Sequence, residues 1–143
     1  MDQERTDQIK ASFERSKTMA LYGARLLTVQ QGYIEIEADK QDFMARPAGM
    51  FNGAAIATLV DVASGYAAVS AKAKDSYVTT VELKINYLSP AIGEQLRAKA
   101  RVIKNGRVLS VVRVDIYAVK AGVEKLAATS LVTMMQLRNP SAP

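Results

Sequence analysis

Hydrophobic and polar positions change their spacing several times along the chain, and each change marks the edge of a predicted element. Residues 2–19 carry scattered apolar positions among charges at helical spacing, which predicts an amphipathic helix. Segments 24–29 and 33–38, on either side of the turn QQG, predict two strands, and the second alternates apolar and polar residues. The next stretch, DKQDFMARPAGM, contains proline and glycine and predicts an irregular connection.

The segment FNGAAIATLVDVASGYAA predicts one long central helix, about residues 53–71, which begins after Asn52. Asparagine is a good N-cap because its side-chain oxygen accepts from the first free backbone N–H groups of a helix. The helix is apolar on nearly every face, so we expect the rest of the fold to surround it. Asp61 near its middle is then unusual, because an ionised carboxylate buried without a partner is costly.

The remainder of the chain predicts three or four long antiparallel strands. The first alternates Val81, Leu83, Ile85 and Tyr87 with polar residues, which places these four side chains on one face. The strand segments in order are VTTVELKINYL, EQLRAKARVI, VLSVVRVDIYAV and LAATSLVTMM.

Together these elements predict an α+β fold in which an antiparallel sheet of five to six strands wraps around one long central helix. Asn105-Gly106, between two of the long strands, favours a two-residue type I′ turn. We find neither an internal repeat nor a linker, so we expect one domain over residues 1–143, with a loose tail at 138–143.

The residue types that are missing restrict the chemistry. The chain has no cysteine and no histidine, which excludes a thiol nucleophile and removes the commonest general base and metal ligand. Acid–base chemistry must then use Asp, Glu, Lys or Tyr, and we expect no metal site. The net charge of +5 fits a phosphate-bearing partner, but no basic run interleaved with aromatics indicates nucleic acid. The polar N-terminus indicates neither a signal peptide nor a membrane segment, so we expect a cytoplasmic protein.

The start of the central helix and the strand after it resemble the hotdog-fold acyl-CoA thioesterases of the phenylacetic-acid-degradation (PaaI-like) type, over roughly residues 20–136. In that family a His-Gly-Gly triplet opens the helix, and an Asp follows nine residues after the His. NGAAIATLVD gives Asn52, Gly53 and Ala54 in the triplet, with Asp61 at the matching distance. The strand VTTVELKINYLSPAIG is similar to the family strand that ends in an aromatic residue followed by a proline.

The resemblance implies an acyl-CoA thioester hydrolase (EC 3.1.2.-) that needs no cofactor beyond the CoA of its substrate. The free N–H groups at a helix N-terminus suit an oxyanion, and the resemblance implies this role for Gly53. Asp61 is expected to attack the thioester or to act as base for a water. Thr80 matches a position where related sequences hold a hydroxyl near that water. Asn52 can donate or accept a hydrogen bond as the family His does, but it takes up no proton near neutral pH.

Helix geometry then predicts more than one subunit per site. Gly53 and Asp61 are eight residues apart, so their Cα atoms are separated by about 12 Å along the helix. Both groups must lie within roughly 3 Å of one reacting carbonyl. Gly53 of one subunit must therefore act with Asp61 of another, which predicts a homodimer with two shared sites. The family's dimers, often paired into homotetramers, are similar to this arrangement.

Residues that contact the substrate are less strongly indicated. Gly65, one turn after Asp61, leaves space beside the carboxylate, and Arg107, Lys104 and Arg46 are the candidates for the CoA phosphates. Each of these features also has an ordinary structural interpretation, as a packing glycine or a solvated charge. A non-catalytic acyl-CoA-binding or ligand-sensing hotdog protein is the alternative function. A hotdog dehydratase is disfavoured because such sites pair a His with an acidic residue. The acyl group is not predicted.

Overall fold

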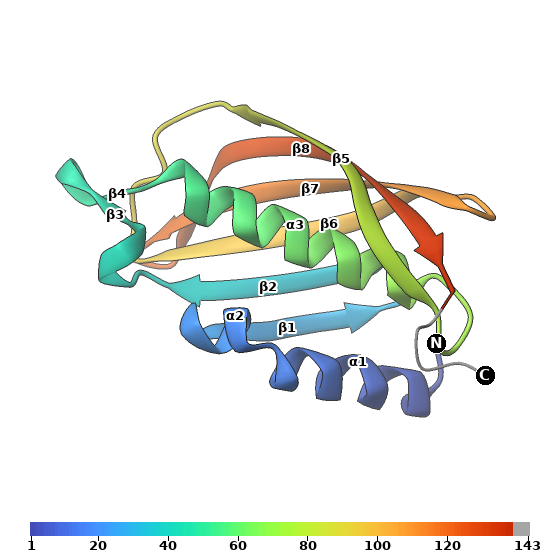
Figure 1. Cartoon of the computed structure of the whole chain (residues 1–143). Helices are drawn as coiled ribbons and strands as arrows, with labels where there is room; N and C mark the ends of the chain where they lie inside the picture. Colours follow the sequence, from blue (N-terminus) through green and yellow to red (C-terminus); the bar gives the residue numbers. More distant parts are fainter. Residues whose placement is uncertain (139–143) are drawn as a thin grey trace.

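The computed structural model describes residues 1–138 and has one six-stranded antiparallel sheet, in the order β1-β2-β6-β7-β8-β5. One long helix, α3, Gly53–Ser70, lies across the concave face of this sheet (Figure 1). The α+β fold with five to six strands around one helix is confirmed. The strands are β1 (Ala24–Gln30), β2 (Tyr33–Asp39), β5 (Tyr77–Tyr87), β6 (Gln95–Asn105), β7 (Leu109–Lys120) and β8 (Val123–Leu137).

The core lies between α3 and the sheet, and strand alternation builds it. In β2, Ile34, Ile36 and Ala38 are fully buried, while the residues between them face outward. In β6, Ala98 and Ala100 face α3 with no exposed surface. Their small side chains let the helix approach the sheet closely, and each fully buried isoleucine contributes about 2 kcal/mol through the apolar surface it removes from water.

Helix α3 is buried on one side only, so the prediction that the fold surrounds it is wrong for the single chain. Ala55, Leu59 and Ala63 pack on the sheet and are almost completely buried. Ala54 and Asp61 lie on the opposite side and are exposed. By length and composition α3 would suit a membrane span, but half of it is buried, as the central helix of this sheet must be.

The N-terminal segment forms two helices where one was predicted over 2–19. Helix α1, Gln3–Arg15, ends at Ser16, whose backbone is extended, and α2, Lys17–Leu21, begins directly after it. The Ser16 hydroxyl accepts from the Met19 N–H at 3.2 Å, so serine serves as the N-cap of the second helix. Helix α1 lies beside β1 and α3, and Phe13 packs against Tyr66 with ring centroids 5.7 Å apart.

The predicted type I′ turn at Asn105-Gly106 is wrong, because residues 106–108 connect β6 to β7 in the structure. The Asn105 side-chain amide instead donates to Ala71 O at 2.9 Å and so ties this hairpin to the end of α3. The two-residue connection lies between β7 and β8. There Ala121 and Gly122 both have positive φ, as a type I′ turn requires.

The connection before α3 is irregular, as the sequence predicts. It consists of two short 3-10 turns and two paired two-residue strands, and its end is fixed by the Asn52 N–H, which donates to Met44 O at 2.7 Å. Its elements are η1 (Asp42–Met44), β3 (Ala45–Arg46), η2 (Pro47–Gly49) and β4 (Met50–Phe51). The predicted loose tail falls mainly on residues 139–143, which lie outside the described residues.

The outer face of the sheet carries a chain of ion pairs across β1, β2, β6 and β8. Glu37, 8% exposed, accepts from Arg25 at 2.6 Å and also from Arg97. Burial alone would raise the pKa of the Glu37 carboxyl, but the hydrogen bonds from Arg25 and Arg97 outweigh it and hold the pKa below its usual range. The remaining pairs of the chain are Arg25–Asp39, Arg97–Glu124 and Lys99–Glu124.

Candidate active site

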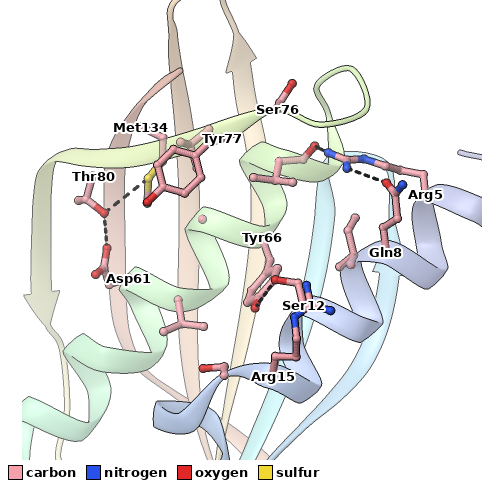
Figure 2. A pocket seen from close by; sticks show the side chains of 16 residues that line it. Arg5, Gln8, Ser12, Arg15, Asp61, Tyr66, Ser76, Tyr77, Thr80 and Met134 are labelled. Carbon is pink, nitrogen blue, oxygen red and sulfur yellow. Dashed lines mark hydrogen bonds between the residues drawn. The ribbon is translucent and has the colours of Figure 1, made fainter. Parts of the chain in front are cut away.

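Asp61 and Thr80 meet on the side of α3 that the sheet leaves uncovered. The Thr80 hydroxyl on β5 donates to Asp61 Oδ1 at 2.6 Å and also lies 3.5 Å from Met134 Sδ (Figure 2). One hydroxyl, from the strand that follows α3, thus holds the carboxylate. The Asp61 side chain is exposed in the single chain, so it carries no burial penalty there.

A β-bulge in β5 brings Thr80 to this position. The pairing of β5 with β8 shifts register between Thr80 and Glu82, which leaves Val81 as the extra residue. Val81 is 56% exposed, while Leu83 and Ile85 beyond the bulge pack against the core. The prediction that Val81 shares one face with Leu83 and Ile85 is therefore wrong. The bulge reverses the alternation, so that Thr80, before the bulge, and Leu83, after it, both face α3.

The N-terminus of α3 presents free backbone donors at Gly53. Asn52 caps the helix, because its Oδ1 accepts from the Ala55 N–H at 2.8 Å, and its amide also donates to Phe43 O at 2.8 Å. The first N–H groups of a helix have no intrahelical partner, so those of Gly53 and Ala54 are left for a ligand. Since both ends of the Asn52 amide are engaged, this side chain acts mainly in holding the helix start.

Tyr87, at the end of β5, lies against the peptide that joins Gly53 to Ala54 at the start of α3. Its hydroxyl donates to Gly53 O at 3.1 Å, and a Cβ added at Gly53 would lie 3.5 Å from the Tyr87 ring. The strand after the helix thus contacts α3 twice, at Asp61 through Thr80 and at Gly53 through Tyr87. Sequence reasoning noted the aromatic residue at the strand end but assigned it no place in the site.

The Asp61–Thr80 pair and the Gly53–Tyr87 pair line two separate pockets. One of about 520 Å³ is lined by Asp61, Thr80 and Gly65 together with residues of α1. Another of about 510 Å³ is lined by Gly53, Tyr87 and Arg46. The eight residues between Gly53 and Asp61 separate their Cα atoms by about 12 Å, so one chain does not bring the two groups to one reacting atom.

The remaining predicted residues divide between these pockets and a distant site. Gly65 lines the first pocket, where an added Cβ would lie 3.9 Å from Met134 Cε, and Arg46 lines the second. Arg107 and Lys104 line neither pocket: Arg107 lies in the β6–β7 connection, and Lys104 lies near the end of β6. That connection is bound to the C-terminal end of α3. Within residues 1–138 no group of three or more acidic side chains is placed to hold a metal ion.

Helix α1 supplies a wall of the first pocket that the sequence did not indicate. Arg5, Gln8 and Ser12 face the pocket from α1, and the Ser12 hydroxyl lies 3.2 Å from the Tyr66 hydroxyl of α3 (Figure 2). The spacing of these residues, one helical face of α1, was the available signal. It gave no indication of what the face covers.

Comparison with known proteins defines the class. Residues 48–125 match the family model described as the thioesterase superfamily. A thioesterase family protein from Silicibacter pomeroyi superimposes with a TM-score of 0.89, at 35% identity, over 94% of this chain and 98% of that one. The PaaI protein from the phenylacetic acid degradation operon of E. coli gives 0.82 at 18% identity, over 94% of both chains. A thioesterase of Haemophilus influenzae (EC 3.1.2.-) gives 0.80 at 18% identity, over 94% and 92%.

These likenesses show that the sheet wrapped on α3 is a hotdog fold; at 18% identity the last two carry the fold alone. The family match spans more than half of the chain and includes Gly53, Asp61 and Thr80. The chain belongs to the thioesterase superfamily.

Proposed function

We propose that this protein is a cytoplasmic acyl-CoA thioesterase that hydrolyses its substrate to a free acid and CoA. The observation that carries the proposal is the contact between the Thr80 hydroxyl and the Asp61 carboxylate, beside a pocket of about 520 Å³. A carboxylate held by one hydroxyl and otherwise open to a pocket is suited to attack a thioester or to deprotonate a water.

In the water route, Asp61 takes a proton while the water oxygen adds to the thioester carbon. The resulting oxyanion is stabilised by the backbone N–H groups at the start of α3, where the helix dipole is positive. Its collapse breaks the C–S bond and releases CoA, whose sulfur takes up a proton. In the nucleophile route, an Asp61 oxygen adds first and a water then cleaves the mixed anhydride. Thr80 holds the carboxylate in both routes.

The oxyanion donors come from a second subunit in this proposal. The distance of about 12 Å along α3 between Gly53 and Asp61 excludes joint action within one chain. Both groups lie on the uncovered side of α3, where the small residue Ala54 lets another helix approach closely. Strand β5 is an edge strand of the sheet, so its free N–H and C=O groups are open to pairing beside this face. A two-fold axis across this face would join the Asp61 pocket of each subunit to the Gly53 pocket of the other, and such dimers can pair into tetramers.

Tyr87 acts in this scheme as a positioning residue. Its hydrogen bond to Gly53 O fixes the rotation of the first peptide of α3, and its ring closes one side of the helix start. Arg46, which lines the same pocket, is our candidate for contact with CoA. Arg107 and Lys104 lie at the opposite end of α3, and we assign them a CoA contact only as the second choice.

A non-catalytic acyl-CoA-binding protein is the alternative, and Asn52 is the observation that favours it. Asn52 replaces the family histidine, and its amide is occupied by Ala55 and Phe43. Hydrolysis through Asp61 does not need a histidine, so we prefer the enzyme.

Thiol release from a panel of acyl-CoA substrates tests the proposal directly. The panel should include straight-chain, aryl and dicarboxylic acyl groups, with calorimetry on a non-hydrolysable acyl-CoA analogue in parallel. We expect turnover of at least one substrate. Tight binding with no turnover across the panel would favour the non-catalytic alternative, and the absence of both would eliminate the two functions together.

A further inference from the structure

The wall that α1 contributes to the Asp61 pocket is polar and basic. Of the residues through which α1 lines this pocket, Ile9 is the apolar one. The opposite wall, from α3 and β5, includes the apolar side chains of Val62, Val69 and Val78. The residues of the polar wall, spaced along one face of α1, are Arg5, Gln8, Ser12 and Arg15.

Arg5 stands at the end of this wall with hydrogen-bonding capacity unused. Its Nη2 donates to Val69 O at 2.7 Å and its Nη1 to Gln8 Oε1 at 3.3 Å. Its Nε is closed off from solvent and has no acceptor, the one such buried side-chain atom within residues 1–138. A guanidinium has five N–H donors, so three of them remain unengaged.

No carboxylate of the described chain pairs with Arg5. The ion pairs among residues 1–138 do not include Arg5 or Arg15. Asp61 is the acidic residue among those lining the pocket, and it lies at the other end. A half-buried cation without a counter-charge is unfavourable, and a planar guanidinium is best satisfied by a carboxylate.

We propose that the acyl group of the substrate ends in a carboxylate that Arg5 binds, while the thioester carbon lies at Asp61. This inference rests on the proposed thioesterase function and names its substrate class: CoA monothioesters of dicarboxylic acids. Arg5 is then the specificity-determining residue at the far end of the acyl pocket.

The separation of the two ends sets the length of the acid. Arg5 is hydrogen-bonded to Val69 O, and Val69 lies eight residues beyond Asp61, about 12 Å along α3. An extended chain advances roughly 3.5 Å per three bonds, so an eight-carbon acid spans roughly 8 Å between its two carboxyl carbons. The remaining few ångströms are taken by the contacts at both ends.

The wall lies outside the part of the chain that the family model matches. The family match covers residues 48–125, which include Asp61 and Thr80 but not α1. The reacting groups therefore belong to the common fold, and the group that selects the acyl chain comes from the N-terminal helix.

The test compares suberyl-CoA with octanoyl-CoA, two eight-carbon thioesters that differ in the terminal carboxylate. We expect the wild-type protein to prefer suberyl-CoA in kcat/KM by roughly tenfold or more, as one charge-assisted pair in a partly desolvated site gives. Arg5→Met should lose this preference, with octanoyl-CoA turnover changed less than about threefold. Lys10→Met, which removes a cation from an exposed position of α1 outside this pocket, should leave the ratio unchanged.

The outcomes separate this inference from the function on which it rests. Hydrolysis of octanoyl-CoA equal to or faster than that of suberyl-CoA by the wild-type protein would overturn the inference and leave the thioesterase intact. An unchanged ratio in Arg5→Met would do the same, and would leave Arg5 as a cap on the last turn of α3. If neither thioester is hydrolysed but another acyl-CoA of the panel is, the inference fails and the thioesterase stands; if no acyl-CoA of the panel is hydrolysed, the proposed function itself fails. The wild-type ratio tests the substrate class even if Arg5→Met does not fold.

Discussion

Among the described residues, charged side chains are paired with one another on one face of this molecule and left unpaired on the other. On the outer face of the sheet, Arg25, Glu37 and Arg97 belong to one continuous chain of ion pairs. On the face formed by α3 and α1, Asp61 and Arg5 line one pocket, and neither has an oppositely charged partner within residues 1–138. The charges of the first face satisfy one another and contribute stability. Those of the second find partners only with a substrate and another subunit in place. Mutations on the first face should therefore affect stability, and mutations on the second should affect catalysis.

The largest expected effect is that of Asp61→Asn on catalysis. Removal of the general base or nucleophile should lower kcat by roughly 10²–10⁴-fold. The free energy of unfolding should change by less than about 0.5 kcal/mol, because the side chain is exposed and the new amide still accepts from Thr80. Thiol-release kinetics and urea unfolding measure the two quantities. Glu14→Gln, on the exposed part of α1, is the matched control and should change neither.

Thr80→Val should have the next largest effect. The loss of its hydroxyl frees the Asp61 carboxylate to rotate, and we expect kcat to fall by about tenfold, as the loss of one positioning hydrogen bond would cause. Thr80→Ser retains the hydroxyl and should keep most of the activity. If the serine variant loses as much as the valine variant, packing of the methyl group matters and the hydrogen bond does not.

Glu37→Gln should do the reverse, with a loss of stability and no loss of catalysis. The change leaves Arg25 and Arg97 without the carboxylate between them, and we expect the free energy of unfolding to fall by about 1–2 kcal/mol. The value is modest because Arg25 is 43% exposed and solvent screens part of the interaction. A variant with normal stability and reduced kcat would contradict the division between the faces.

The same carboxylates predict how stability depends on pH. Burial raises the pKa of Glu37 and of Glu124, but hydrogen bonds from basic partners lower both pKa values more, to below the ordinary 4.5. The stability that a lowered pKa contributes is present above the unfolded value and is lost as pH falls through the folded value. Unfolding free energy should therefore decrease below about pH 4.5, and more gradually in Glu37→Gln.

Tyr87→Phe should give the smallest change, a decrease of about threefold in kcat with little change in KM. The variant removes the hydrogen bond to Gly53 O but keeps the ring against the helix start. Tyr87→Leu, which also removes the ring, should lose more. Equal losses in the two variants would indicate that the hydroxyl alone positions the peptide, and no loss in either would remove Tyr87 from the site.

Most of the fold follows from the sequence because strand alternation and the long apolar helix are local patterns. Ile34, Ile36 and Ala38 are buried as their spacing predicts. The break at Ser16 was missed, and the sequence placed a break at AGVEK without indicating that Ala121-Gly122 alone make the turn. A polar residue such as Ser16 inside an amphipathic pattern does not by itself indicate a helix N-cap. Ala-Gly is also a weaker turn signal than Asn-Gly.

The site was less predictable, because it depends on how elements meet. Asp61 and Gly53 stand out through the spacing of the helix-start motif, but the bulge at Val81 is set by the pairing of β5 with β8. Without the bulge, Thr80 and Leu83 would face opposite sides of the sheet. The packing of α1 against the Asp61 pocket is likewise a tertiary contact, so the helical spacing of Arg5, Gln8 and Ser12 did not indicate what that face covers.

Subunit mixing tests the central claim, that Asp61 and Gly53 act together from different chains. Asp61→Asn and Gly53→Val should each be inactive alone, the second because its side chain occupies the space where the carbonyl approaches the helix start. After the two are unfolded and refolded together, half of the dimers are mixed and each contains one intact site. The mixture should recover roughly a quarter of wild-type activity. Activity that stays at the level of the separate variants, although mass spectrometry shows mixed dimers, would contradict the account.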